Sequence, residues 1–275
     1  MPEIVESSDG FKWYVEVQSD RLPLNDGEAS VRKFLEMVSD PNRIFVDIGC
    51  HVGSYAIRMS RLYKEVIAID PNPRSIQILK KNMELNGVKN IKILNVGVGS
   101  KTEKMKIFLR GGSSTFLEVK DAEKVAYATV MPLDDLIEKA DVIKIDVEGW
   151  EEEVMKGARR IISECKPIFV IEHHEFRDYD ECKGMKERII KMLSDYHHFD
   201  LNGVHTAYVP ENFDLSTIKE VIVWHWVNKA VKNIENGKPW YYGFPYTWWY
   251  GGGIIDFLLG GPKHILREKE WLEKS

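Results

Sequence analysis

The segment DIGCHVG at residues 47–53 places an aspartate and two glycines where an expected strand passes into an expected helix. Glycines at such a turn let the backbone bend sharply and approach a ligand closely, and the free N–H groups of a helix start attract anionic groups. The spacing is DxGxxxG, which differs from the GxGxxG loop of dinucleotide-binding proteins. Asp47 would repel a pyrophosphate, but its carboxylate can accept a hydrogen bond from an α-ammonium group.

A second carboxylate, Asp70, ends the next expected strand in the segment AIDPNP. At that position it can accept hydrogen bonds from both ribose hydroxyls of an adenosine, over the carboxyl ends of the first two strands. Ammonium, ribose and adenine together predict S-adenosylmethionine as the ligand. The alternative is that the two aspartates only cap helices. The predicted cofactor-binding residues are Asp47, Gly49, Cys50, His51, Gly53, Asp70, Pro71, Val98 and Asp146.

The strand expected in DVIKIDVEGWE, residues 141–151, carries charges that are unusual for a buried strand. Alternation puts Lys144, Asp146 and Glu148 on one side, so three charges converge near its carboxyl end. Buried charges need a partner or a task. One interpretation is an ion pair from Lys144 to Asp146 or Glu148 that positions the loop. The other places Asp146 beside the reactive methyl group, where it can orient the acceptor.

The next strand, PIFVIEHH, delivers Glu172, His173 and His174 to the same edge of the sheet. A hydroxyl acceptor is a poor nucleophile, so a base that removes its proton would speed the reaction, and histidine suits that role. His173 is slightly preferred because it is nearer the strand end. A metal site made from Asp146, Glu172 and a histidine is chemically possible, but no ligand spacing indicates one, so no metal ligand is predicted. The predicted catalytic residues are Asp146, Glu148, Glu172 and His173.

Strands and helices alternate from residue 44 onward, which predicts an α/β, Rossmann-like domain with a mostly parallel seven-stranded sheet. A strand near residues 11–17 and a helix over 28–38 precede it. The strands at 104–109 and 124–130 are expected to extend the sheet, and those at 205–209 and 219–227 to close it as an antiparallel pair. The expected divisions are an extension over 1–43, a catalytic domain over 44–228 and an aromatic-rich appendage over 229–275.

The appendage, with its run KPWYYGFPYTWWYGGG, could cover an apolar face, close over the site, stack on sugar rings or pair subunits into a homo-oligomer. The net charge of −5 provides no global positive field of the kind that favours a nucleic-acid partner. Three cysteines without a CxxC pair favour a reducing cytoplasm, and no apolar run is long enough to span a membrane.

The segments FVDIGCHVGSY, AIDPNPRSIQILKKNMELNG, GGSST, LDDL and IKIDVEGWEEEVMKGA resemble the FkbM family of S-adenosylmethionine-dependent methyltransferases over residues 28–225. The resemblance implies a class I methyltransferase fold, a cofactor loop at 47–53, a ribose contact at Asp70 and a reaction centre at Asp146 to Glu151. Two positions depart from the family: Cys50-His51 replaces Ala-Asn, and Asp70 replaces the commoner Glu.

The acceptors that the resemblance implies are hydroxyls on small molecules or glycans. One alternative is N-methylation of RNA or protein, against which the chain has no NPPY-like tetrapeptide after DVEG. The other is a non-catalytic subunit that binds the cofactor.

Overall fold

The computed structural model describes residues 2–24, 28–110, 113–119, 122–175, 180–215 and 235–238. The chain divides into two compact units, Met1–Phe213 and Asp214–Ser275. The first unit contains the sheets and helices described below. The strand expected over 219–227 lies outside the described residues, as does the aromatic-rich segment apart from residues 235–238. The expected boundaries after residues 43 and 228 stay predictions.

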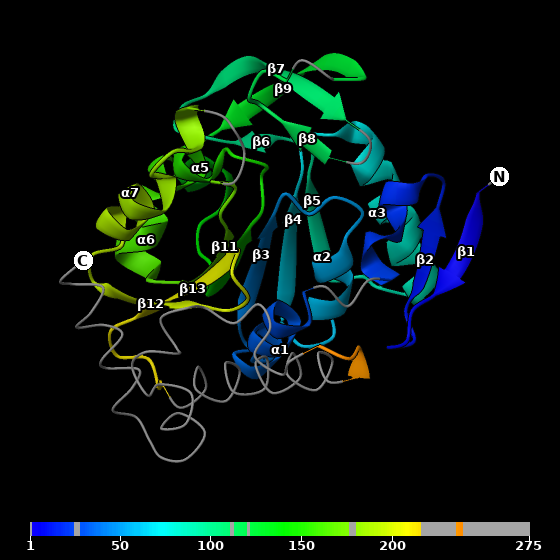
Figure 1. The fold of residues 1–275 in the computed structure, drawn as a ribbon, viewed down its shortest axis with the longest axis horizontal. Coiled ribbons are helices and arrows are strands. Elements are labelled where there is room, and N and C mark those ends of the chain that lie inside the picture. Colours follow the sequence, from blue (N-terminus) through cyan, green and yellow to red (C-terminus); the bar gives the residue numbers. More distant parts are fainter. Residues whose placement is uncertain are drawn as a thin grey trace. The chain divides into compact units, whose positions relative to one another are not determined.

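A seven-stranded sheet of mostly parallel strands forms the centre of the first unit (Figure 1). Its order is β12-β13-β11-β10-β3-β4-β5. The parallel strands are β3 (Ile44–Ile48), β4 (Glu65–Ile69), β5 (Ile91–Leu94), β10 (Val142–Ile145) and β11 (Ile168–Glu172). Every residue of β3 and β10 is buried, as expected for strands covered on both faces. The prediction of a Rossmann-like α/β fold is confirmed at this level.

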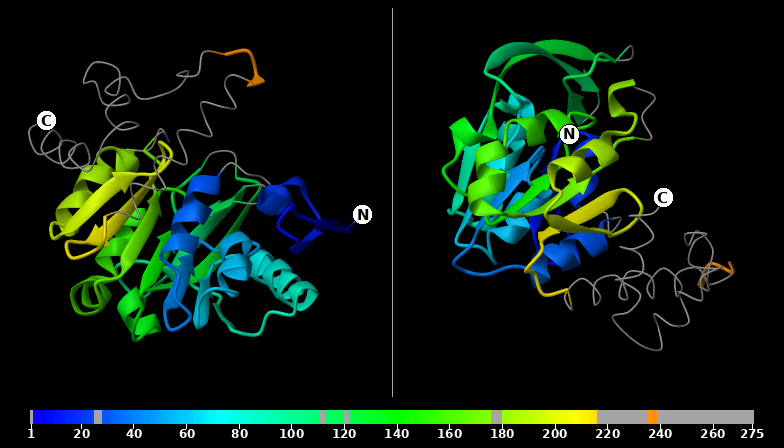
Figure 2. Two further views of the ribbon diagram at one scale, coloured as in Figure 1. Left: turned by 90° about the horizontal axis from the view of Figure 1, so that it is seen from below. Right: turned by 90° about the vertical axis from the view of Figure 1, so that its left-hand side faces the viewer.

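Helices lie on both faces of this sheet (Figure 2). They are α1 (Ala29–Met37), α2 (Ser54–Met59), α3 (Pro73–Asn86), α4 (Leu133–Leu136), α5 (Glu151–Lys156), α6 (Arg159–Cys165) and α7 (Met185–Met192), with short 3₁₀ turns η1 (Gln18–Leu24) and η2 (Asp180–Cys182). Alternate residues of β3 face opposite cores: Val46 joins the cluster that contains Val154 and Ile161, whereas Phe45 packs against the ring of Tyr63, 5.3 Å away. None of the helices within the described ranges is both long and apolar enough to cross a membrane.

The closing strands of the sheet differ from the prediction. Strand β13 (His205–Pro210) is antiparallel to both β11 and β12 (Tyr196–Asp200), whereas the expected antiparallel partner was the segment 219–227. Helix α7 stops at Met192, and the chain turns into β12 at Tyr196. The polar turn between β12 and β13 is closed by Asn202, whose side-chain oxygen accepts from the backbone N–H of His205 at 2.9 Å.

The strands expected to extend the central sheet form a sheet of their own, so that prediction is wrong. The order is β6-β9-β7-β8, with β6 (Gly97–Val98), β7 (Glu103–Arg110), β8 (Ser113–Thr115) and β9 (Lys124–Met131). The chain leaves the central sheet after β5 and pairs β6 with β9 instead. Figure 1 shows this second sheet at the top, beyond the carboxyl ends of the central strands.

The N-terminal region holds two strands where one was expected. Strand β1 (Glu3–Glu6) pairs antiparallel with β2 (Lys12–Val15), and η1 follows. Asp20 anchors η1, because its buried carboxylate accepts from the backbone of Glu16 at 2.9 Å and from Arg74 at 2.7 Å. This anchor brings the N-terminal region close to the helix that follows β4.

Candidate active site

The loop between β3 and α2 adopts the backbone conformation that its glycines allow. Gly49 and Gly53 have φ values of 81° and 90°, in the left-handed region, and His51 lies there too, at 48°. A Cβ on Gly49 would lie 1.8 Å from the carbonyl oxygen of Asp146. Gly49 therefore lets the loop lie directly against the end of β10. A Cβ on Gly53 would meet Leu79 at 2.3 Å, so this second glycine allows α2 to pack on α3.

Two buried carboxylates support the loop. Asp70 accepts from the backbone N–H of His51 at 2.9 Å and of Asn72 at 2.8 Å. One oxygen of Asp47 accepts from Ala56 at 3.1 Å, and the other has no hydrogen-bond partner among the described residues. Burial raises the pKa of each aspartate to about 6, although Lys144 opposes the rise at Asp47 and the backbone donors oppose it at Asp70. Helix capping is thus part of what Asp47 does, as the alternative interpretation supposed.

A cavity of about 320 Å³ opens over the carboxyl ends of β3, β4 and β10. The predicted cofactor residues that line it are Gly49, His51, Asp70, Pro71, Val98 and Asp146. The other three, Asp47, Cys50 and Gly53, are buried and are not part of the lining. These three residues therefore support the loop from within the protein and do not face the cavity.

Sequence reasoning missed several lining residues, which come from the N-terminal region, the second sheet and the turn before α5. They are Ser19, Leu22, Ser114, Phe116 and Trp150. The rings of Phe116 and Trp150 lie 5.6 Å apart and form an aromatic wall. Gly97 permits this wall, because a Cβ there would lie 2.4 Å from the Phe116 ring. The motifs GGSST and DVEGWE adjoin these residues, but nothing in their spacing indicated a shared cavity.

Lys144 and Asp146 form the ion pair that the charged strand suggested. Lys144 Nζ lies 3.0 Å from Asp146 Oδ2, and the lysine side chain is only 2% exposed. Burial alone would raise the pKa of Asp146, but the charge of Lys144 holds it below its usual range. Asp146 also lines the cavity together with Glu148. Asp146 therefore both pairs with Lys144 and lines the cavity, so the two interpretations of the charged strand are compatible.

His174, rather than His173, joins the carboxylates at the end of β10. His174 Nδ1 lies 2.7 Å from Glu151 Oε1, and its Nε2 lies 3.7 Å from both Glu148 and Glu172. Burial alone would lower the pKa of His174, but the hydrogen bond and charge of Glu151, with neighbouring carboxylates, raise it to about 9.

His173 points elsewhere, since its Nε2 bonds the hydroxyl of Tyr208 at 2.9 Å and it does not line the cavity. Burial lowers the pKa of His173 to about 3. The structure therefore brings Asp146, Glu148 and Glu172 together through His174 and leaves His173 outside the group. The assignment of His173 as the base stays a prediction.

Comparison with known proteins identifies the family of the chain. The model of the methyltransferase FkbM domain matches residues 47–201, more than half of the chain. Methyltransferase sdnD of Sordaria araneosa is 25% identical over 219 residues, covering 65% of this chain and 82% of the relative. Methyltransferase 1 of Beauveria bassiana is 22% identical over 160 residues, covering 47% of this chain and 64% of the relative.

Among solved structures, the FkbM methyltransferase from Methylobacillus flagellatus KT is 23% identical, with a TM-score of 0.45. That match covers 62% of this chain and 44% of the other, so the chain spans less than half the length of that protein. The family match includes the glycine loop at residues 47–53, Asp70 and the charged strand with its DVEG turn. The chain therefore belongs to the FkbM family of methyltransferases.

Proposed function

We propose that this methyltransferase uses S-adenosylmethionine as the methyl donor and methylates a hydroxyl group on a small molecule or glycan. The observation that carries the proposal is that Asp70 and Asp146 line one cavity and that the glycine loop contacts both, through His51 and Gly49 respectively. Cys50, Cys165 and Cys182 form no disulfide with one another, which is consistent with the proposed cytoplasmic location.

The residues of the cavity fit the proposed cofactor. Asp70 can accept from the ribose hydroxyls while it keeps its two backbone donors, because each carboxylate oxygen can accept more than one hydrogen bond. Phe116 and Val98 offer an apolar surface for adenine. Asp47, whose second oxygen has no hydrogen-bond partner among the described residues, attracts the ammonium end through its charge.

When bound, the cofactor supplies a methyl group that is electrophilic because it is attached to a positively charged sulfur. Its transfer would form a bond from the acceptor oxygen to the methyl carbon and would leave the electron pair of the broken bond on sulfur. Asp146 and Glu148 line the cavity where the acceptor would lie; the carboxylate of Asp146 can orient its hydroxyl, and that of Glu148 can receive its proton. The paired Lys144 keeps Asp146 ionised and therefore able to accept a hydrogen bond.

The first prediction tests the acceptor class. With methyl-labelled S-adenosylmethionine and fractionated host extract, label should enter the small-molecule or glycan fraction in an alkali-stable ether linkage. The Asp70→Ala variant should transfer much less label, because it loses hydrogen bonds to the ribose that are worth about 1.5–3 kcal/mol each. Asp135→Ala, at an exposed carboxylate of α4, is the matched control and should behave as the wild type. Label in RNA or protein would contradict the acceptor class, and failure to bind cofactor in calorimetry would contradict the proposal as a whole.

The second prediction concerns pH. Because the pKa values of Asp47 and Asp70 are raised to about 6, both carboxylates are ionised at neutral pH and gain protons as the pH falls below that value. Neutral carboxyl groups attract the cationic cofactor less, so calorimetry should show constant affinity above about pH 7 and weaker binding at about pH 5. The folding stability of the cofactor-free protein changes with pH in the opposite direction. The raised carboxyl pKa values contribute stability at low pH that is lost as the pH rises through about 6.

The cofactor should therefore raise the melting temperature more at neutral pH than in acid. Asp70→Asn removes one of the two titrating groups, so this variant should bind weakly at neutral pH and show a shallower pH dependence. An affinity that stays constant between about pH 5 and about pH 7.5 in the wild type would contradict the role of both aspartates.

A further inference from the structure

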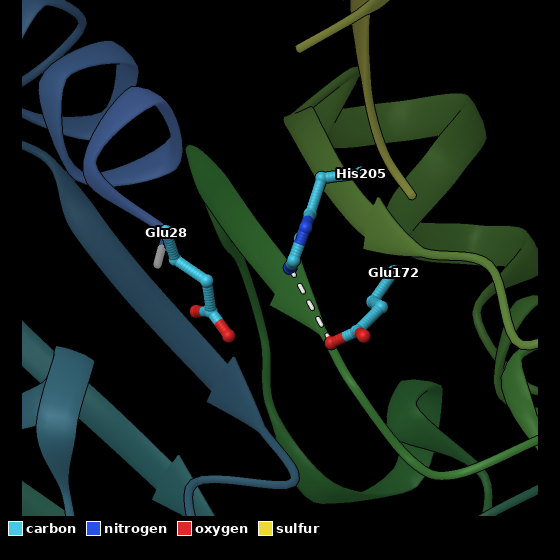
Figure 3. Close-up of side chains that lie close together, drawn as sticks. All are labelled: Glu28, Glu172 and His205. Atoms are coloured by element: carbon cyan, nitrogen blue, oxygen red, sulfur yellow. Dashed lines mark ion pairs between the residues drawn. The ribbon is translucent and has the colours of Figure 1, made fainter. Parts of the chain in front are cut away.

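A second group of possible ligand atoms lies beside the active site. Glu28 precedes α1, Glu172 ends β11 and His205 begins β13, and one atom from each lies within 4.8 Å of the others. Figure 3 shows the three side chains converging from separate elements. Glu172 and His205 are direct partners in the antiparallel register, so their side chains leave the same face of the sheet. The fold thus brings the three residues together, although they lie far apart in the sequence.

His205 is held in a way that suits a metal ligand. Its side chain is 1% exposed, and its Nδ1 lies 3.2 Å from both the side-chain oxygen and the side-chain nitrogen of Asn202. That oxygen is fixed in place because it also accepts from the backbone of Val204 and His205. A proton on Nδ1 leaves a lone pair on Nε2, and a hydrogen-bonded outer partner of this kind orients most metal-binding histidines.

Nε2 of His205 has no hydrogen-bond partner among the residues that the structure describes, although Glu172 Oε2 is 3.4 Å away. A buried nitrogen lone pair that faces a carboxylate is repelled by it unless a cation lies between them. Glu28 is oriented as well, because its Oε2 accepts from the hydroxyl of Tyr55 at 2.5 Å. Two carboxylates and one imidazole nitrogen therefore surround one point.

We propose that Glu28, Glu172 and His205 bind one divalent transition-metal cation, such as Mn²⁺ or Zn²⁺. Two carboxylates with one imidazole favour these ions over Mg²⁺ and Ca²⁺, which prefer oxygen ligands alone. The neighbouring set Asp146, Glu172 and His174 is less suitable, because Lys144 already neutralises Asp146 and Glu151 already bonds His174. Three protein ligands leave coordination positions open for water or for an acceptor oxygen.

The proposed cation would be close to the acceptor side of the cavity. Glu172 Oε1 lies 3.7 Å from His174 Nε2, which in turn lies 3.9 Å from Asp146 Oδ1 on the cavity wall. Any effect of the cation on turnover, such as binding the acceptor hydroxyl, rests on the proposed function. Binding of the cation by itself does not.

The test is Mn²⁺ binding to the full chain, measured by calorimetry and by electron paramagnetic resonance without cofactor or acceptor. The wild type should bind one Mn²⁺, with nitrogen coupling from a histidine in the spectrum. His205→Gln should weaken the affinity at least about 10-fold and remove that coupling, and Asn202→Ala should weaken it about 10- to 100-fold through loss of orientation. His197→Gln, which removes a histidine of β12 outside the group, is the control and should bind as the wild type.

Circular dichroism of each metal-free variant checks folding, and Asn202→Ala provides a second variant in which the ligands are intact. Absence of Mn²⁺ and Zn²⁺ binding in the wild type would overturn the proposal, as would unchanged binding in His205→Gln. Because no cofactor is present, these results are independent of methyl transfer. A chain that transfers methyl groups but binds no cation would refute only the metal site, and a chain that binds Mn²⁺ but transfers no methyl group would refute only the proposed function.

Discussion

Gly49→Ala is expected to weaken S-adenosylmethionine binding at least 100-fold, a loss of about 2.7 kcal/mol. The added Cβ would lie 1.8 Å from the carbonyl oxygen of Asp146, which is backbone and has little room to move. The φ of 81° at this position adds strain for any residue with a side chain. Loop and strand must therefore separate, and the loop loses its place on the cavity wall. Calorimetry with the cofactor and its demethylated product measures the effect.

The Gly87→Ala variant separates the effect of the close contact from the effect of backbone strain. Gly87 also has a left-handed φ, of 64°, but its Cβ would meet no atom within 4 Å. This variant should lose about 1 kcal/mol of folding stability and keep normal cofactor affinity. If Gly49→Ala bound the cofactor as tightly as Gly87→Ala does, the close contact of loop and strand would have no importance for binding.

The glycine turn at residues 47–53 could be predicted from sequence because its requirements are local. Glycine is the residue type that tolerates a left-handed φ, so DxGxxxG at a strand end reports a turn at Gly49 and Gly53 directly, and both positions adopt it. The alternation of charges on β10 similarly predicted that Lys144 and Asp146 share a side, and they form an ion pair. Both inferences depend on spacing within one element.

The parts that could not be predicted depend on contacts between distant segments. The strands β7 and β9 alternate as any sheet strand would, so their pattern did not distinguish an extension of the central sheet from a separate sheet. Phe116 and Trp150 form a wall because that second sheet lies over the turn before α5. The preference for His173 over His174 used distance along the chain, whereas the side-chain direction, set by the end of β11, brings His174 to the carboxylates.

Lys144→Met is expected to destabilise the fold by about 3–5 kcal/mol, the range for removing one partner of a buried ion pair. The ammonium group lies 3.0 Å from Asp146 and 4.6 Å from the centre of the Tyr55 ring. Its charge also opposes the rise in the pKa of buried Asp47. Without it, buried Asp47 and partly buried Asp146 lose their compensating charge. Lys166→Met is the control, because Lys166 and Asp195 form an ion pair with both side chains more than half exposed, and its loss should cost at most about 1 kcal/mol.

Urea unfolding followed by circular dichroism measures both variants, and a double variant identifies the cause. If the uncompensated charge on Asp146 is responsible, Lys144→Met combined with Asp146→Asn should be more stable than Lys144→Met alone. The two substitutions should then be non-additive by about 1–3 kcal/mol, as for residues in direct contact. Additive effects would instead mean that Lys144 stabilises the fold through its packing on Tyr55. The alternating charges of β10 would then have no energetic coupling, and the ionised state of Asp146 at the cavity wall would need another source.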